Sequence, residues 1–157
     1  MTMQFDVKSQ HAAVSGLMVP YRTRLKGAVI FPFSGATGYS AFVENTSIAG
    51  TYTRATTTAT VTATGHGLST GQWVYLDWDL TDNPYQVTVT TPNAFTVTVT
   101  DTGAASGNVT VYNKMLLQAD ASNATAFTMV IPGEGILADQ GIRVFLAADI
   151  HCTIFYG

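Results

Sequence analysis

Charged residues are scarce in this sequence of 157 residues, where they make up only 11% of the chain. Soluble domains usually contain about a quarter of such residues. Apolar residues make up 46%, which is enough for a core. The net charge of −3 argues against a general nucleic-acid-binding protein, because such a protein needs a dense basic face to displace counterions. A surface with so few charges instead tolerates close contact with other proteins.

Cysteine and long apolar runs are rare as well. The single cysteine, Cys152, excludes an intrachain disulfide and a pair of cysteine metal ligands, and its apolar surroundings favour a buried, inert thiol. No segment approaches the roughly 18 uninterrupted apolar residues of a membrane span. Residues 1–20 also lack the basic and apolar regions of a signal peptide. We therefore expect a chain that stays in the cytoplasm until it is assembled or released, with no membrane partner.

The three histidines give no recognisable catalytic set. His66 lies between two glycines in an expected turn, and no base or nucleophile can be identified for it. A role in stabilising or packing the turn is therefore favoured over catalysis. His11 and His151 are far apart in the sequence, and neither has a second ligand at a metal-binding spacing.

Three aspartates, Asp77, Asp79 and Asp82, have a spacing that could hold a hard cation. However, no glycine-containing loop with a downstream glutamate follows them, so a solvated acidic face is the favoured interpretation. We expect a protein that is not an enzyme, with no catalytic residues, no bound metal and no cofactor.

Residues 56–111 form a threonine-rich tract in which bulky side chains alternate with small or hydroxyl side chains. This period of two is typical of strands. Turn-forming residues separate the runs, for example Gly65-His66-Gly67 and Pro92-Asn93. About five short strands with tight turns predict a small barrel or sandwich. The runs are TTTATVTATGHG, QWVYLDW, YQVTVTT, AFTVTVT and NVTVY.

The segments on either side of this tract are more apolar. Neither side alone has enough strands to bury a sheet face, but together they reach the size of a sandwich. The expected strands are 21–33 and 39–44 before the tract, and 114–118, 126–131, 142–146 and 152–156 after it.

The sequence therefore predicts an all-β protein with a β-sandwich (jelly-roll-like) host domain and a small inserted β-barrel. The host consists of residues 1–54 and 114–157, and the barrel of residues 55–113 lies at a hairpin tip, where insertions are best tolerated. No continuous helical period is present. The stretch 135–141 is expected to form a turn of helix at most.

The inserted tract resembles a small β-barrel module of phage tail-fibre and tail-associated proteins. The shared pattern is a strand, a GHGL turn, a second strand after a glycine, an AFTV strand and a closing strand. Where that module has a glycine-containing turn before its third strand, this chain has Asp82-Asn83-Pro84. The matching positions are Gly65, His66, Gly67, Leu68, Gly71, Ala94, Phe95, Thr96 and Val97.

The flanks resemble a second family, the small virion-associated proteins of marine and cyanobacterial phages. The matching segments are RTRLKGAVIF at 22–31, IPGEGI at 131–136 and the ending IFYG at 154–157. This resemblance implies a structural component of the virion, assembled in the cytoplasm of the host bacterium.

Two sets of side chains are candidate contact sites. Arg22, Arg24 and Lys26 alternate, so in a strand they point to one side. They form either a solvated sheet face or an interface with an acidic neighbour such as a capsid shell; nucleic acid is disfavoured because three charges bind weakly at physiological salt. Trp73 and Trp78 are five residues apart and face opposite ways on one strand. One is expected in the core and the other on the surface, as a sugar or protein contact.

The leading hypothesis is a capsid decoration or cement protein, with the sandwich bound to the particle and the barrel projecting outward. Its partners would be the major capsid protein or another virion protein. One alternative is a tail, neck or fibre-associated structural protein. Another is a carbohydrate-binding module on the virion surface, in which an exposed tryptophan binds a glycan.

The low charge of the flanking strands also predicts a homo-oligomer, with a trimer as the first expectation. Residues 25–41 contain only Lys26 as a charged residue, and residues 115–119 contain none. Edge strands so poor in charge need burial, and a closed symmetric ring provides it. Nothing marks residues 12–20 as a strand or helix, so this apolar stretch is expected to reach a neighbouring subunit or the shell.

Overall fold

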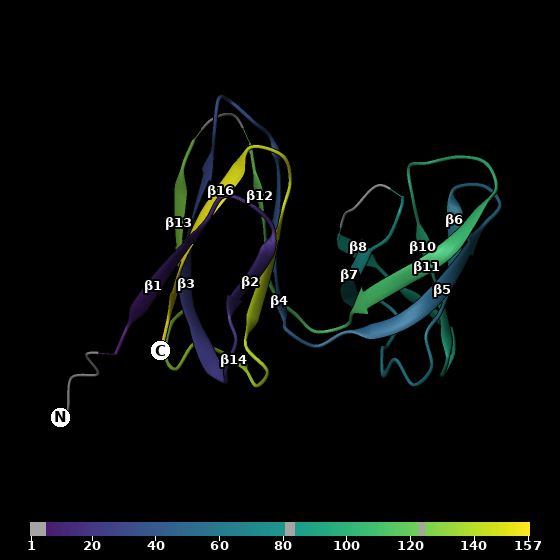
Figure 1. The fold of residues 1–157 in the computed structure, drawn as a ribbon, viewed down its shortest axis with the longest axis horizontal. Coiled ribbons are helices and arrows are strands. Elements are labelled where there is room, and N and C mark those ends of the chain that lie inside the picture. The colour runs from purple at the N-terminus through teal and green to yellow at the C-terminus, as the bar shows by residue number, and fades with distance from the viewer. Residues whose placement is uncertain (1–5, 81–83, 123–124) are drawn as a thin grey trace. The chain divides into compact units, whose positions relative to one another are not determined.

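The computed structural model describes residues 6–80, 84–122 and 125–157, and in these residues the protein is all-β (Figure 1). The chain divides into two compact units. Residues 1–45 and 116–157 form the first unit, and residues 46–115 form the second. The described segments contain no helix with the length and hydrophobicity needed to cross a membrane.

The first unit is a sandwich of two sheets (Figure 1). The five-stranded sheet has the order β1 (Lys8–Ala12), β16 (Ile150–Tyr156), β3 (Thr23–Pro32), β13 (Phe127–Val130), and β14 (Ile136–Ala138) also pairs with β3. The four-stranded sheet has the order β12 (Met115–Ala121), β4 (Gly38–Glu44), β15 (Ile142–Leu146), β2 (Gly16–Val19).

The order of these strands is that of a jelly roll. Strands β1 to β4 alternate between the two sheets, and the later strands return beside them in reverse order: β12 beside β4, β13 and β14 beside β3, β15 beside β2, and β16 beside β1. The first half of the unit is thus paired strand by strand with the second half. The expectation of a jelly-roll-like sandwich is confirmed.

The core of the sandwich follows from the alternation of side chains along its strands. In β16 the residues Ile150, Cys152 and Ile154 are fully buried, while the residues between them are partly exposed. Ile30 of β3 and Phe42 of β4 are buried in the same cluster. Each such apolar side chain contributes roughly 1.5–3 kcal/mol through removal from water. Burial also raises the pKa of the Cys152 thiol to about 12, so the single cysteine is the inert thiol that its surroundings predict.

Two expectations about the flanks are wrong. Residues 12–20 do not form a free arm, because β2 pairs with β15 and β1 pairs with β16. The stretch 135–141 contains strand β14 instead of a turn of helix. All three strands are only three to five residues long, and their burial does not alternate regularly, so no period of two marks them in the sequence.

The second unit is one seven-stranded sheet curled into a nearly closed barrel (Figure 1). Its edge strands β8 and β9 are separated only by Val87, so one continuous segment of chain supplies both edges. Val87 is buried, and its N–H donates to the carbonyl of Gln72. The strand order is β8 (Pro84–Gln86), β7 (Trp73–Asp77), β11 (Ala105–Tyr112), β5 (Ile48–Arg54), β6 (Thr58–Thr62), β10 (Ala94–Thr98), β9 (Thr88–Thr91).

The threonine alternation of the sequence forms the wall of this barrel. In β6 the side chains of Ala59 and Val61 are fully buried, and Thr58 and Thr62 are exposed. In β10 the ring of Phe95 is fully buried in the same apolar cluster. β-branched threonine suits this exposed, pleated surface without adding charge.

The second unit begins at Thr46, not at residue 55 as the sequence analysis placed it. The reason is β5, which is an internal strand of the barrel and pairs with both β6 and β11. The sequence of β5, IAGTYTR, lies before the obvious threonine tract and was therefore assigned to the host.

This boundary predicts the outcome of two deletions. The end of β4 and the start of β12 lie at the same end of neighbouring strands (Figure 1). Replacing residues 46–115 with an Asn-Gly turn should therefore leave a jelly roll that melts cooperatively in calorimetry. Replacing residues 55–113 instead should give an aggregating chain, because β5 keeps its apolar face but loses both of its neighbours. Equal solubility and melting of the two shortened chains would contradict the boundary.

Candidate functional site

The basic run lies at one end of the five-stranded sheet. Arg22 precedes β3 and forms an exposed ion pair with Asp139, with 3.1 Å between Nε and Oδ1. Arg24 lies in β3, and its Nη1 donates to the Gly135 carbonyl at 3.3 Å. The Nζ of Lys26 donates to the Glu134 carbonyl at 2.9 Å.

Only Arg24 and Lys26 therefore belong to one row of a strand, whereas Arg22 lies outside it. The expectation that all three side chains lie on one strand face is therefore wrong for Arg22, because β3 begins at Thr23. The two strand residues fix the turn of the IPGEGI motif through its carbonyls, and their charges remain at the surface of the sheet. The interface assigned to these residues stays a prediction.

An aromatic and imidazole cluster occupies the outer face of the same sheet. The rings of His11 and Phe31 stack with centroids 5.7 Å apart, and those of Phe33 and His151 stack at 5.7 Å with an interplanar angle of 6°. The two histidine rings meet edge to face at 5.8 Å. Thr153 lies within hydrogen-bond distance of His11, with 3.2 Å between Oγ1 and Nδ1. The face thus combines flat apolar rings with imidazole and hydroxyl groups.

The apolar character continues along the next row of this face. Phe155 of β16 pairs with Gly27 of β3, and Gly27 pairs with Val130 of β13. Val130 is 80% exposed and Phe33 is 63% exposed. We name the set of Val29, Phe31, Phe33, Val130 and Phe155, with the two histidines, the outer-face patch. A contiguous exposed apolar patch on a folded protein usually marks a site where another molecule binds.

The outer-face patch does not follow from the pattern of the sequence. His11 and His151 are far apart in the chain, but the pairing of β1 with β16 and of β16 with β3 brings them together. A signal was present in residues 28–33, AVIFPF, which are apolar in both phases of a strand. A strand with one face in water shows apolar residues in one phase only, so this run indicates two covered faces.

In the barrel, His66 holds the GHGL turn together from the inside. It is 1% exposed, and its Nδ1 accepts a hydrogen bond from the Leu68 N–H at 3.0 Å. Its Nε2 lies 3.1 Å from the Thr91 carbonyl, which can only accept, so the proton is on Nε2. Its ring meets Phe95 edge to face at 5.3 Å. Nδ1 therefore closes the GHGL turn and Nε2 ties this turn to the end of β9, in agreement with the predicted stabilising role.

A second cluster joins the buried rings of Tyr52 and Trp78 to the exposed carboxylate of Asp79. The Tyr52 hydroxyl donates to Asp79 Oδ1 at 2.5 Å, and the Tyr52 and Trp78 rings meet edge to face at 5.0 Å. Burial of Tyr52 and its bond to Asp79 raise its pKa to about 12. Asp82 lies outside the described residues, and within the described ranges no group of three or more metal-ligating side chains could hold an ion.

One of the two tryptophans is exposed and the other is buried, as expected, but they do not share a strand, because β7 ends at Asp77, one residue before Trp78. Trp73 is 46% exposed, while Trp78 is 8% exposed and packs in the barrel core. Trp78 is therefore unsuited to be a surface contact. Trp73 begins β7 and lies directly opposite Gln86 of β8.

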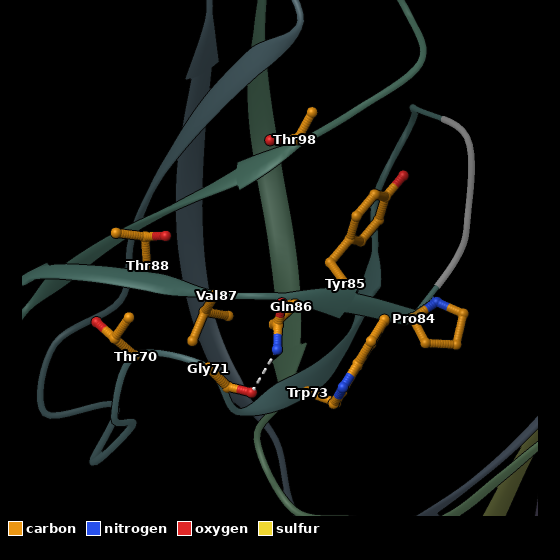
Figure 2. A pocket seen from close by; sticks show the side chains of 9 residues that line it. All are labelled: Thr70, Gly71, Trp73, Pro84, Tyr85, Gln86, Val87, Thr88 and Thr98. Atoms are coloured by element: carbon orange, nitrogen blue, oxygen red, sulfur yellow. Dashed lines mark hydrogen bonds between the residues drawn. The ribbon is translucent and has the colours of Figure 1, made fainter.

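Trp73 borders an open pocket of about 450 Å³ on the barrel (Figure 2). Figure 2 shows Trp73 and Pro84 on one side of the pocket, Gln86 in its middle, and Thr70 and Thr88 on the other side. The Nε2 of Gln86 donates to the Gly71 carbonyl at 3.0 Å, which fixes the amide. The described residues that line the pocket include no charged side chain.

No protein-family model matches this chain, and no curated protein is significantly similar to it.

The His66 bonds predict a specific loss of barrel stability. His66→Ala leaves the Leu68 N–H and the Thr91 carbonyl without their partner and creates a cavity beside Phe95. We expect a decrease of about 2–3 kcal/mol in the free energy of unfolding of the barrel. Urea unfolding followed by the fluorescence of buried Trp78 measures it. The exposed His11→Ala serves as control and should cost under about 0.5 kcal/mol; equal losses would contradict the assigned role.

The raised pKa of Tyr52 predicts alkaline sensitivity of the barrel. The folded-state pKa of about 12 exceeds the ordinary value of 10.0. The protonated Tyr52 hydroxyl therefore stabilises the folded barrel fully below pH 10, and this stabilisation is lost as the pH rises from 10 to 12. Tyr52→Phe should flatten the decline in barrel stability over that window, as followed by Trp78 fluorescence. Tyr39→Phe, in the other unit, should leave the decline unchanged; a Tyr52→Phe profile that follows the wild type would refute the assignment.

Proposed function

We propose that this chain is a structural protein of a bacteriophage particle and acts as a capsid decoration or cement protein. The observation that carries the proposal is the outer-face patch, whose centre is apolar and whose exposed members include Phe33 and Val130. Such a face is costly in water and gains stability when another protein covers it. In a protein that remains bound to a particle, an apolar face of this kind stays covered by the partner.

The fold supports this proposal at the level of analogy. Jelly rolls occur in viral capsid proteins, but also in lectin domains and cupins, so the fold does not choose the function alone. The resemblance of residues 22–31 and 131–136 to small virion-associated proteins favours the particle. The resemblance of the barrel to tail-fibre modules supports the second candidate, a tail, neck or fibre component.

The surroundings of the outer-face patch suit an acidic partner. Arg24 and Lys26 lie on the same sheet at the end of β3, and their side chains bind carbonyl groups instead of carboxylates. Protein interfaces commonly have an apolar centre and a polar rim. An apolar centre beside the cationic side chains of Arg24 and Lys26 therefore fits a shell whose surface carries carboxylates, such as the major capsid protein.

The edge strands support a homo-oligomer, for which we propose a trimer. β12 is the edge strand of the four-stranded sheet, and Asp120 is its only charged residue. An edge with so little charge needs a cover to prevent uncontrolled pairing. Three copies in a closed ring provide one and suit a three-fold site on an icosahedral shell.

The proposal is tested by adding the protein back to particles that lack it. The purified protein is first sized by native mass spectrometry, where a trimer is expected, and cryo-electron microscopy should then place it on the capsid. Val130→Asp introduces a carboxylate into the outer-face patch and should weaken binding at least tenfold, or about 1.4 kcal/mol. Val14→Asp is the matched control, because Val14 is 76% exposed in the turn between β1 and β2.

Three results would overturn parts of the proposal. Density on the tail or neck would favour the second candidate. Equal binding of Val130→Asp and Val14→Asp would remove the outer-face patch from the contact. A monomeric mass would reject the trimer and leave the particle alone to cover β12.

A further inference from the structure

We propose that the pocket beside Trp73 is a binding site for neutral carbohydrate. The described residues that line the pocket all belong to the barrel unit and come from β7, β8, β9 and β10 and from the segments beside β7 and β8. The inference goes beyond the proposed virion role and does not depend on it, because it rests on this pocket alone.

The first step is the exposed indole of Trp73. It lies opposite Gln86 in the β7–β8 pair, so the two side chains are neighbours on the outer face of the barrel. An indole that is 46% exposed on a regular strand carries an unburied apolar face. The flat C–H face of a sugar ring can cover such an indole, while the sugar hydroxyls remain at the rim.

The second step is the set of polar groups around the indole. The bond from Gln86 Nε2 to the Gly71 carbonyl orients the amide and leaves its carbonyl oxygen as an acceptor for a ligand hydroxyl. Thr70 Oγ1 accepts from the Val89 N–H at 2.9 Å and can therefore donate its own proton. Thr88 and Thr98 add two further hydroxyls to the lining. A polyol requires this mixture of donors and acceptors.

The third step is the absence of charge among the described residues that line the pocket. Acidic saccharides and phosphorylated ligands need a cation for tight binding, and these lining residues supply none. Proline-rich peptides need several exposed aromatic ridges, whereas Tyr85 is 7% exposed and Trp73 alone is open. These differences favour a neutral sugar over a charged sugar or a peptide.

The site is held in place before a ligand arrives. Trp73, Pro84 and Gln86 belong to paired strands, and Val87 beneath them is bonded through its backbone to Gly71 and Gln72. A preformed site loses little conformational freedom on binding. A single open platform of this size predicts a Kd of about 0.1–1 mM for one site.

The experiment uses the full chain and five probes: maltohexaose, chitotetraose, a galactan-derived tetrasaccharide, oligogalacturonate and a proline-rich decapeptide. Nuclear magnetic resonance titration follows the Gln86 side-chain amide and the Trp73 indole N–H. We expect at least one neutral saccharide to shift both signals, and the acidic saccharide and the peptide to shift neither. Trp73→Ala should weaken binding more than tenfold, and Trp73→Tyr should recover part of it.

Phe33→Ala is the matched control, since it removes an exposed aromatic ring in the other unit and should leave saccharide binding unchanged. If Trp73→Ala does not fold, Gln86→Leu replaces it and should reduce affinity at least fivefold while Trp78 fluorescence stays native. The proposal is overturned if no neutral saccharide binds at 10 mM, if the peptide or acidic saccharide binds instead, or if binding survives both substitutions. None of these results bears on attachment to the particle, which the Val130→Asp experiment measures.

Discussion

The architecture depends on one constraint: the chain must leave and re-enter the jelly roll at neighbouring strands, and the inserted barrel must begin and end on neighbouring strands. In the jelly roll, β4 and β12 are neighbours in one sheet, and the chain leaves after one and returns before the other. In the barrel, the first strand β5 and the last strand β11 pair directly, with Ile48 opposite Val111. Because both units satisfy this condition, the barrel can interrupt the jelly roll without separating strands that must pair.

The sequence predicts those strands that have one buried face and one exposed face, because their apolar and polar side chains alternate. The threonine tract predicted the barrel wall because its outward positions are hydroxyl and its inward positions are apolar, as in β6 and β10. The same rule failed for β1, β2 and β14, which are only three to five residues long and show no regular alternation of buried and exposed positions. It also failed for β5, whose place in the barrel depends on pairing with β11, more than 50 residues later. Long-range pairing is not encoded in any local period.

The candidate sites show the same division. A difference in exposure between Trp73 and Trp78 could be predicted from their spacing, although Trp78 follows the end of β7 and the three residues Val74 to Leu76 of this strand are all buried. The outer-face patch could not, because its two histidines belong to β1 and β16, at opposite ends of the chain. The open pocket could not be predicted from the sequence either, because Thr70, Gln86 and Thr98 come from three separate segments. A site that is assembled across strands needs the sheet order before its members can be named.

The outer-face patch and the pocket beside Trp73 differ in how well water solvates them, and this difference separates their proposed roles. Phe33 and Val130 expose apolar atoms with no hydrogen-bonding capacity, so a lasting contact that excludes water stabilises them most. The pocket beside Trp73 combines one apolar ring with hydroxyl and amide groups that water satisfies well. Displacing that water yields only a small net gain, which suits a weak and reversible ligand. Several copies of the chain on one particle would then bind a multivalent saccharide far more tightly than one weak site does, because linked sites act together.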